Sequence, residues 1–258
     1  MSHLVRLHRQ YLPRNFSEPL RVLDLCTGTG CIPLLFHHEF YSGDQNREEA
    51  LELLGVDISG DALSLARENL ILQIAEQAKT FAHESTRLRS LHRIGFVQAD
   101  VLTPGPSKAN AAVDGAPSLT QALERFGQEF DILISNPPYI SPKSFYRTTH
   151  RSVRNYEPKL ALVPPASSKQ DDEAIGDAFY PRLIQVAEQV GARMLLLEVA
   201  DMEQAQRVAS LAAAGDIWQR IEIWRDDPSG VVEDVMIGSH TIRVRGSGNG
   251  RSVFACRA

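Results

Sequence analysis

The stretch RVLDLCTGTGCIPLLFHHEF, residues 21–40, contains a strand, a turn and a helix in immediate succession. Its first five residues form a run typical of a buried strand, and the apolar residues from Cys31 to Phe40 predict a helix. Between these segments, Gly28 and Gly30 permit a tight turn and let the backbone approach a ligand. A plain tight turn explains the same glycines, so this stretch indicates the fold before it indicates a function.

The alternation of strands and helices continues along the chain. Further strands are predicted at residues 51–57, 94–100, 131–135, 192–200, 218–226 and 251–258, and further helices at 59–77 and 201–215. This alternation implies a parallel sheet with helices on both faces. The last two strands are joined only by a glycine-rich, polar segment at residues 226–250, which favours an antiparallel hairpin. We therefore expect an α/β fold with a doubly wound, mostly parallel, seven-stranded sheet and a C-terminal antiparallel hairpin.

The length and composition indicate one domain over residues 1–258, because a chain of 258 residues, 43% of them hydrophobic, can form one stable core. Three segments interrupt the strand–helix pattern and are interpreted as insertions. They lie near residues 76–93, 103–128 and 164–176. Their polar or proline- and glycine-rich composition favours disorder.

The composition also excludes several classes of protein. The formal charge of −5 and the isoelectric point near 5.9 argue against a duplex-DNA binder, whose affinity comes from a basic surface. The three cysteines and eight histidines lack the spacing of metal ligands, so no metal is expected, and the sparse cysteines indicate a reducing compartment. No apolar run is long enough to span a membrane. The opening residues fit an amphipathic helix (Leu4, Leu7, Tyr11 and Leu12) and are weakly compatible with a transit peptide.

Three polar loops are expected at the carboxyl ends of the first strands, where open parallel sheets bind ligands. The first is the turn from Cys26 to Gly30. Asp57 ends the second strand and can accept hydrogen bonds from both hydroxyls of a ribose, although a helix cap is an equally good interpretation. Asp100 ends the third strand and can receive an exocyclic amine, although a solvated turn is its more common role. The turn lacks the dinucleotide pattern G-x-G-x-x-G, because Cys-Ile-Pro follows Gly30, which argues against a nicotinamide enzyme.

A fourth loop, within FDILISNPPYISP at residues 130–142, carries the most specific signal. Asn136 offers a side-chain oxygen and Pro137 a carbonyl oxygen, and together they can accept both N–H hydrogens of a planar amide or aromatic amine. Such a double acceptor raises electron density on the nitrogen and aims its lone pair at an electrophilic methyl group. Pro137 and Pro138 have fixed φ angles that hold the acceptors in place, and Tyr139 can stack on the flat target group. An ordinary proline-rich loop is the alternative.

The four loops together resemble those of the Rossmann-like, S-adenosylmethionine-dependent methyltransferases. VLDLCTGTGCIPLL, GVDIS, ISNPPYI and YEPKLALV are similar to motifs of the HemK-type (PrmC-type) release-factor glutamine methyltransferases, over most of the chain from about Arg21 onward. The resemblance implies transfer of a methyl group from S-adenosyl-L-methionine, which becomes S-adenosyl-L-homocysteine. The implied acceptor is the side-chain amide nitrogen of the glutamine in the GGQ motif of a class I peptide-chain release factor.

The resemblance also implies roles for individual residues. The expected cofactor-binding residues are Cys26, Thr27, Gly28, Thr29, Gly30, Asp57, Asp100, Val101 and Asn136. The expected substrate-binding residues are Asn136, Pro137, Pro138 and Tyr139, of which Asn136, Pro137 and Tyr139 are also expected to be catalytic. Glu157 and Pro158 match the second motif, Y-E-P, and are assigned only a loop-positioning role.

Two features depart from the family pattern. Members normally have a helical N-terminal domain and a P-R-x-E-T-E segment, whereas this sequence begins at Met1 with SHLVRL. The long insertions are unlike those of compact bacterial members and suggest a eukaryotic member. Relatives of that kind commonly serve mitochondrial release factors, so a mitochondrial location is expected by analogy, with the cytoplasm as the alternative.

Two other functions stay open. N-P-P-Y also occurs in amino methyltransferases that act on adenine or guanine in RNA or DNA, and four basic residues closely follow the loop. These are Arg147, His150, Arg151 and Arg154. Such residues are more typical of a solvated helix face or a docking surface for a charged partner, so nucleic acid is not expected to be the direct substrate. A non-catalytic, cofactor-binding partner subunit is the second alternative, and the intact N-P-P-Y argues against it.

Overall fold

The computed structural model describes residues 1–11, 18–43, 47–81, 85–103, 116–165 and 171–257. Within it the chain divides into two compact units. The first contains Met1–Ile134 with Val190–Arg193, and the second contains Ser135–Gln189 with Met194–Ala258. That residues 1–258 act as one catalytic domain stays a prediction.

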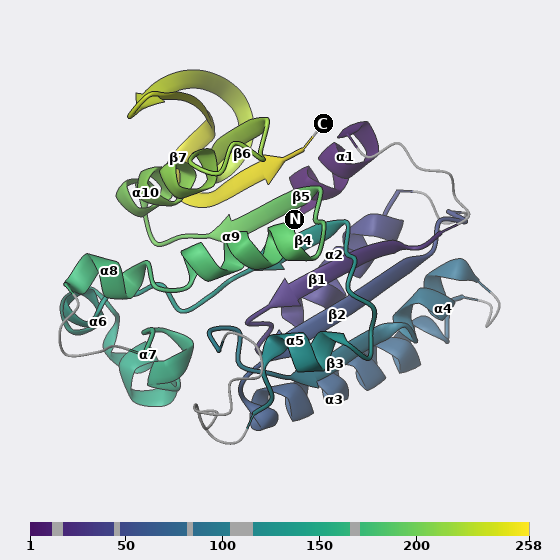
Figure 1. Cartoon of the computed structure of the whole chain (residues 1–258). Helices are drawn as coiled ribbons and strands as arrows, with labels where there is room; N and C mark the ends of the chain where they lie inside the picture. Colours follow the sequence, from purple (N-terminus) through teal and green to yellow (C-terminus); the bar gives the residue numbers. More distant parts are fainter. Residues whose placement is uncertain (12–17, 44–46, 82–84, 104–115, 166–170, 258) are drawn as a thin grey trace. The chain divides into compact units, whose positions relative to one another are not determined.

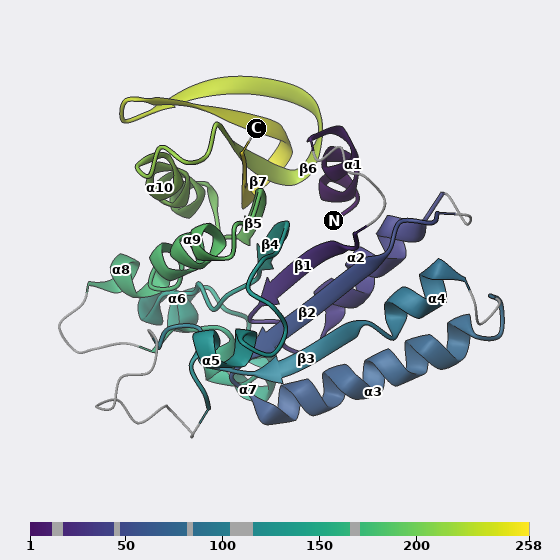
Figure 2. The same cartoon turned by 45° about the vertical axis from the view of Figure 1, so that its right-hand side comes forward.

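The first unit contains a parallel sheet that forms where the sequence predicts buried strands. The strands are β1 (Leu20–Leu25), β2 (Leu51–Asp57) and β3 (Ile94–Gln98), and β4 (Ile132–Ser135) begins in this unit. Leu20 lies opposite Leu51, and Leu53 lies opposite Ile94. The helices are α1 (Ser2–Tyr11), α2 (Cys31–Tyr41), α3 (Gly60–Gln77), α4 (Thr86–Leu91) and α5 (Leu119–Leu123). Figure 2 shows α3 running along β3, as expected of a crossover helix between parallel strands.

The N-terminal helix α1 is amphipathic, as its sequence predicts. Leu4, Val5 and Leu7 are buried, and the His8 ring lies 5.6 Å from the Phe40 ring of α2, centroid to centroid. Burial of one apolar face against a neighbouring helix is what stabilises a helix of this length. Leu12, the last residue of the predicted apolar face, lies outside the described residues.

The second unit contains the antiparallel part of the sheet. Its strands are β5 (Met194–Glu198), β6 (Arg220–Ile237) and β7 (His240–Cys256), and β7 pairs with both of the others. Its helices are α6 (Pro142–Arg147), α7 (Arg151–Tyr156), the 3₁₀ turn η2 (Lys159–Ala161), α8 (Asp172–Gly176), α9 (Tyr180–Gln189) and α10 (Met202–Ala213). The base of the hairpin is apolar, and the Trp224 and Phe254 rings stack 4.8 Å apart.

The strand order confirms the predicted fold class. The order is β3-β2-β1-β4 among the strands of the first unit and β5-β7-β6 among those of the second. Neighbours in the first set for which a register is given are parallel, whereas β7 is antiparallel to β5 and β6. The described residues therefore form the expected seven-stranded, mixed sheet with a C-terminal antiparallel hairpin.

The largest departure from the sequence-based prediction lies at residues 226–250. The sequence predicts a polar connection there, but β6 and β7 continue into it and pair as far as Ile237 opposite His240. Figure 1 shows the result as a long, curved ribbon. Gly238, with φ of +61°, and Ser239 form the two-residue connection. Gly-Ser between two strands is a recognised hairpin signal, and it would have placed the turn within the segment that was expected to be only a polar connection.

A buried carboxylate holds the base of this ribbon. Glu222 is fully buried and accepts hydrogen bonds from Arg245 Nε (2.7 Å), Arg220 Nε (2.7 Å) and Trp224 Nε1 (2.9 Å). Burial alone raises the pKa of Glu222, but these three donors outweigh it and lower the pKa below its ordinary value. Because every partner comes from the hairpin itself, the ion cluster fixes the register where β6 and β7 leave the sheet.

Two smaller corrections concern element ends and insertions. β3 ends at Gln98, not at Asp100, which instead forms an isolated bridge with Ser118. The described parts of the three predicted insertions are partly helical, in contrast to the disorder that their composition favours. They contain the end of α3 with α4, and α5 and α8. Side-chain caps explain these helices, since Ser85, Ser118 and Asp171 each accept a hydrogen bond at a helix N-terminus.

Candidate active site

The turn after β1 has the backbone geometry of a ligand-binding loop. Gly28 and Gly30 have φ of +55° and +77°, and Cys26 also has a positive φ, of +62°. A Cβ on Gly30 would lie 2.8 Å from Phe96 Cζ, so packing requires glycine there, whereas a Cβ on Gly28 would meet nothing within 4 Å. Positive φ at a non-glycine residue such as Cys26 costs about 1 kcal/mol or more and is concentrated at functional sites.

Asp57 ties this turn to the end of β2. The backbone N–H of Gly28 donates to Asp57 Oδ2 (2.7 Å), and that of Ser59 donates to Asp57 Oδ1 (2.9 Å). The α3 cap is Ser59, whose hydroxyl accepts from the Ala62 N–H, so Asp57 does not serve as the helix cap. Each carboxylate oxygen of Asp57 retains a second lone pair that can accept a ligand hydroxyl. The predicted ribose contact stays a prediction.

Asp100 and Val101 follow β3 and lie in a loop that Asp100 itself stabilises. The Asp100 side chain accepts from the Leu102 N–H (2.9 Å) and from the Thr103 hydroxyl (2.5 Å), and Val101 is buried. Because β1, β2 and β3 are parallel, this loop, Asp57 and the Cys26–Gly30 turn all lie at the carboxyl-terminal edge of the first unit's sheet. The structure therefore brings together the predicted cofactor-binding residues of this unit.

Asp24 lies close to Thr27 and Asp57 of this group, and the sequence analysis did not single it out. Its side chain, on the residue before the last one of β1, is 1% exposed, and neither carboxyl oxygen has a hydrogen-bond partner among the described residues. Burial raises the pKa of Asp24 to about 8; the nearby Thr27 hydroxyl lowers it and the Asp57 charge raises it further. A carboxyl placed inside an apolar strand without a partner is costly, and the Asp in VLDL was the available signal.

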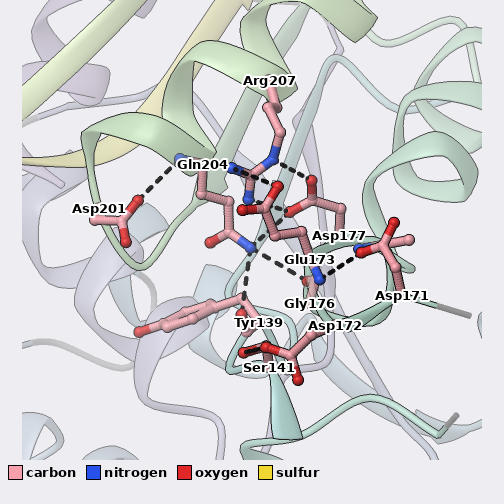
Figure 3. A network of polar contacts seen from close by, with 11 residues as sticks. Tyr139, Ser141, Asp171, Asp172, Glu173, Gly176, Asp177, Asp201, Gln204 and Arg207 are labelled. Atoms are coloured by element: carbon pink, nitrogen blue, oxygen red, sulfur yellow. Dashed lines mark hydrogen bonds and ion pairs between the residues drawn. The ribbon is translucent and has the colours of Figure 1, made fainter. Parts of the chain in front are cut away.

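The second unit holds the Asn-Pro-Pro-Tyr tetrapeptide, which we call the acceptor loop (Asn136–Tyr139). It follows β4 directly. Asn136 is exposed, whereas Pro137 and Pro138 are buried, so the amide is presented on a packed backbone. The Tyr139 hydroxyl donates to Glu198 Oε1 (3.1 Å). The backbone carbonyl of Tyr139 accepts from Gln204 Nε2 (3.2 Å), and Figure 3 shows this second contact.

The Tyr139 hydroxyl stays protonated at neutral pH and can therefore donate a hydrogen bond. Burial first, and then the neighbouring Glu198 carboxylate, raise the pKa of Tyr139 to about 12. Burial also raises the pKa of Glu198, although the Tyr139 hydrogen bond opposes that rise. The Tyr139–Glu198 hydrogen bond therefore holds the aromatic ring in one orientation at neutral pH.

Residues that follow the Y-E-P segment form a backbone hydrogen bond with the residue that follows the acceptor loop. Glu157 and Pro158 are exposed at the junction of α7 and η2, and the Pro158 carbonyl accepts from the Ala161 N–H (2.9 Å). Four residues after Pro158, the Leu162 carbonyl accepts from the Ile140 N–H (2.9 Å). This contact supports the loop-positioning role that the sequence assigns to the motif, which stays a prediction.

The basic residues after the acceptor loop lie on α6, α7 and the turn between them. Arg147, His150 and Arg151 are exposed, and Arg154 is half-buried and donates to the Tyr146 carbonyl (3.3 Å). In the described part of the chain, no three His, Cys, Asp or Glu side chains form a group able to hold a metal ion. Among the same residues, no helix has the length and apolar character needed to cross a membrane.

Comparison with known proteins now identifies the family. The family model described as "Eco57I restriction-modification methylase" matches residues 52–189, more than half of the chain, including β2 to β4 and the acceptor loop. The chain belongs to this methylase family. The "Probable MRF1 mitochondrial N(5)-glutamine methyltransferase mtq1" of Schizosaccharomyces pombe is 30% identical over 203 residues, which cover 75% of this chain and 52% of that protein.

A bacterial relative agrees with this membership, and a solved structure shares the fold. The "Release factor glutamine methyltransferase" of Chlorobaculum tepidum is 35% identical over 144 residues, 56% of this chain and 35% of that protein. These names confirm the family resemblance that the motifs predict, and the chain spans about half the length, or less, of these two relatives. The N-terminal domain of human METTL16 has a TM-score of 0.50 at 14% identity, covers 99% of this chain and 67% of that one, and shows the shared fold.

Proposed function

We propose that this chain transfers a methyl group from S-adenosyl-L-methionine to the side-chain amide nitrogen of a glutamine, the one in the GGQ motif of a class I peptide-chain release factor. The observation that carries the proposal is the acceptor loop, in which an exposed Asn136 amide stands beside two buried prolines. The names of the relatives support the choice of a release factor as the partner. The mitochondrial name of the fission-yeast relative supports a mitochondrial location.

The residues of the first unit fit the proposed cofactor. The unpartnered carboxyl of Asp24 suits the ammonium group of the cofactor, because a bound cation offsets the cost of its burial. Asp57 would accept the ribose hydroxyls, and Asp100 with Val101 would hold the adenine. The Cys26–Gly30 turn, open at Gly28, allows close approach of the backbone. When bound, the cofactor supplies an electrophilic methyl group on a positively charged sulfur.

The residues of the second unit make the target nitrogen nucleophilic. Asn136 Oδ1 and the Pro137 carbonyl accept the two N–H hydrogens, which localises the lone pair and aims it at the methyl carbon. The nitrogen that Asn136 and Pro137 orient would take the methyl group that the bound cofactor supplies, and S-adenosyl-L-homocysteine would be the other product. The nitrogen, now positively charged and acidic, releases one proton to solvent. Tyr139 stacks on the amide plane, held there by its hydrogen bond to Glu198.

One experiment tests this function directly. The protein is incubated with cofactor carrying a labelled methyl group and an intact class I release factor, or the same factor with the GGQ glutamine replaced by alanine. We expect label in the first release factor and none in the second, with the added methyl group located on that glutamine by mass spectrometry. Label that persists in the alanine variant, or that is absent from both, contradicts the proposal.

A second candidate function is methylation of an exocyclic amine of adenine or guanine in nucleic acid. The restriction-modification name of the family model and the exposed Arg147, His150 and Arg151 favour it. The same labelled assay with tRNA, ribosomal RNA and DNA separates the two functions, because their acceptors carry the label in different molecules. Cofactor binding without turnover on any of these acceptors would favour a non-catalytic partner subunit.

A further inference from the structure

Gln204 is a buried amide with an unusually complete set of partners. Its side chain is 3% exposed, lies on the first turn of α10, and accepts from the Ala200 N–H through Oε1 (2.8 Å). Its Nε2 lies 3.2 Å from the Tyr139 carbonyl, 3.2 Å from the Gly176 carbonyl and 2.9 Å from Asp177 Oδ1. Two N–H hydrogens thus serve three acceptors from the acceptor loop and the end of α8 (Figure 3).

The surrounding charges fix Gln204 in this position. Arg207, one turn along α10, donates from Nε to Asp177 Oδ2 (2.6 Å) and from Nη2 to Asp177 Oδ1 (3.1 Å). This bidentate pair holds the carboxylate that orients the Gln204 amide. At the other end of the side chain, the Asp201 cap accepts from the Gln204 backbone N–H (2.9 Å). Both ends of Gln204 are therefore positioned before any substrate binds.

The contact with Tyr139 is close and leaves little room for movement. A Cβ on Gly176 would lie 3.2 Å from the Tyr139 carbonyl oxygen, so α8 packs against the same peptide group that Gln204 binds. Two residues further on, Ser141 Oγ donates to Asp172 Oδ2 (2.6 Å) in α8. The proline rings fix φ at residues 137 and 138, and Pro138 also restricts ψ of Pro137, but ψ of Pro138 is not fixed by a ring, so an external contact at Tyr139 is needed to hold the end of the loop in one conformation.

We propose that Gln204 is a positioning residue, which acts through the Tyr139 carbonyl to hold Asn136 and Pro137 in the conformation that receives the target amide. The expected fall in the methylation rate rests on the proposed function. The expected loss of order in the acceptor loop does not. Gln204 touches neither of the two proposed acceptors. Its loss should therefore loosen the acceptor loop without removing any group that contacts substrate.

The expected effect is on the chemical step. A displacement of about 1 Å in a positioned acceptor can lower a rate by up to about a hundredfold. For Gln204→Leu, which removes the donor, we expect kcat for release-factor methylation to fall about tenfold or more, with KM for the cofactor nearly unchanged. Gln204→Glu retains the acceptor for Ala200 and the side-chain size but loses the amide donor, and it should show the same change in kcat.

Two measurements test this, with a matched control on the same helix. Gln206→Leu and Gln206→Glu make the same chemical changes at a half-exposed position of α10 outside this network, and should leave kcat unchanged. Hydrogen–deuterium exchange of the peptide containing the Tyr139 and Ile140 amides should be faster in both Gln204 variants than in the wild type or the controls. Each variant is also checked by thermal unfolding, so that a Gln204→Leu chain that fails to fold is replaced by Gln204→Glu.

The outcomes separate this inference from the proposed function. Unchanged exchange in a folded Gln204 variant overturns the positioning role, whatever the substrate. Faster exchange with normal kcat overturns it as well, because loop order would then be irrelevant to the reaction. If wild-type protein does not methylate release factor, the proposed function fails, and the exchange experiment still decides whether Gln204 orders the acceptor loop.

Discussion

The two units of the chain treat their polar groups in opposite ways. In the first unit, Asp24 is buried without a hydrogen-bond partner and Cys26 has a positive φ. Both features lower the stability of the folded protein, and a bound ligand could offset that cost. In the second unit, the Tyr139 hydroxyl and carbonyl both have partners, and the exposed polar group is Asn136. The comparison shows that the first unit contains a buried carboxyl whose cost a bound cation would offset, whereas the second unit holds a loop in place through contacts that are already made.

This contrast predicts that substitutions will act on different quantities. Changes in the first unit should alter cofactor affinity and the pH dependence of stability. Changes in the acceptor loop should alter the chemical step and leave cofactor affinity nearly intact.

Asp24→Asn should stabilise the cofactor-free protein, and more so as pH rises. The folded-state pKa of Asp24, about 8, lies above the ordinary value of 3.8, so wild-type stability falls as pH rises between these values. Asparagine does not ionise, so the variant should gain up to about 4 kcal/mol at neutral pH, and almost nothing near pH 4. Urea unfolding at several pH values measures this gain.

The same substitution should weaken cofactor binding, because a neutral amide cannot pair with an ammonium group. Asp61→Asn, at an exposed position in the first turn of α3, is the matched control and should show neither effect. A stability gain that is independent of pH would mean that Asp24 is not the titrating group. The contrast between the buried, unpartnered carboxyl of the first unit and the partnered groups of the second would then be lost.

Asn136→Ala should lower the rate of methyl transfer more than any other change in the acceptor loop. It deletes an acceptor whose value grows as charge develops on the nitrogen, so the single-turnover rate should fall by about a hundredfold or more. The exposed Asn155 of α7 provides the control Asn155→Ala. Near-normal turnover by Asn136→Ala on release factor would show that the double-acceptor mechanism is wrong.

Asp57→Ala should act on cofactor affinity. In the role proposed for Asp57, the change removes charge-assisted hydrogen bonds to the ribose, each worth about 1.5–3 kcal/mol, so the dissociation constant should rise at least about tenfold. It also removes the acceptor for the Gly28 and Ser59 N–H groups, so thermal unfolding must be measured alongside calorimetry. With Asp61→Ala as the control, an unchanged dissociation constant would place the ribose elsewhere.

The sequence predicts the local elements well because their signals lie within short windows. The apolar strand, the two glycines and the helix of residues 21–40 form where expected, as β1, the turn and α2. The acceptor loop is also recognisable from its four residues alone. Local patterns of this kind depend on backbone geometry and side-chain periodicity, which a single segment contains.

The contacts that complete the site could not be predicted in the same way. Gln204 and Tyr139 lie 65 residues apart in sequence, and nothing in DMEQAQ indicates that one of its glutamines binds a proline-rich loop. Asp24 is different, since a carboxyl within an apolar strand is visible in the sequence and was simply not weighted. The long ribbon was likewise signalled by Gly238 and Ser239 but masked by its polar, glycine-rich composition.

The smallest effect is expected from Tyr139→Phe, which retains the ring and removes only the hydroxyl that donates to Glu198 (3.1 Å). Because the ring can still stack on the amide, we expect KM for release factor to change little and kcat to fall only about two- to fivefold. Loss of one hydrogen bond should cost about 1 kcal/mol of stability.

The pH dependence of that cost identifies its origin. Burial already raises the pKa of Glu198, and loss of the Tyr139 donor should raise it further. When the folded-state pKa of a carboxyl lies above its unfolded-state pKa, the free energy of unfolding falls as pH rises above the unfolded-state pKa. The stability that Tyr139→Phe loses relative to the wild type should therefore be smallest in acid and grow toward neutral pH. Tyr146→Phe, at an exposed ring on α6, is the control, and urea unfolding of both variants is measured in acid and at neutral pH. If Tyr139→Phe instead lowered cofactor affinity as strongly as Asp57→Ala, substitutions in the two units would not act on separate quantities. A change confined to the acceptor loop would then affect the binding proposed for Asp57.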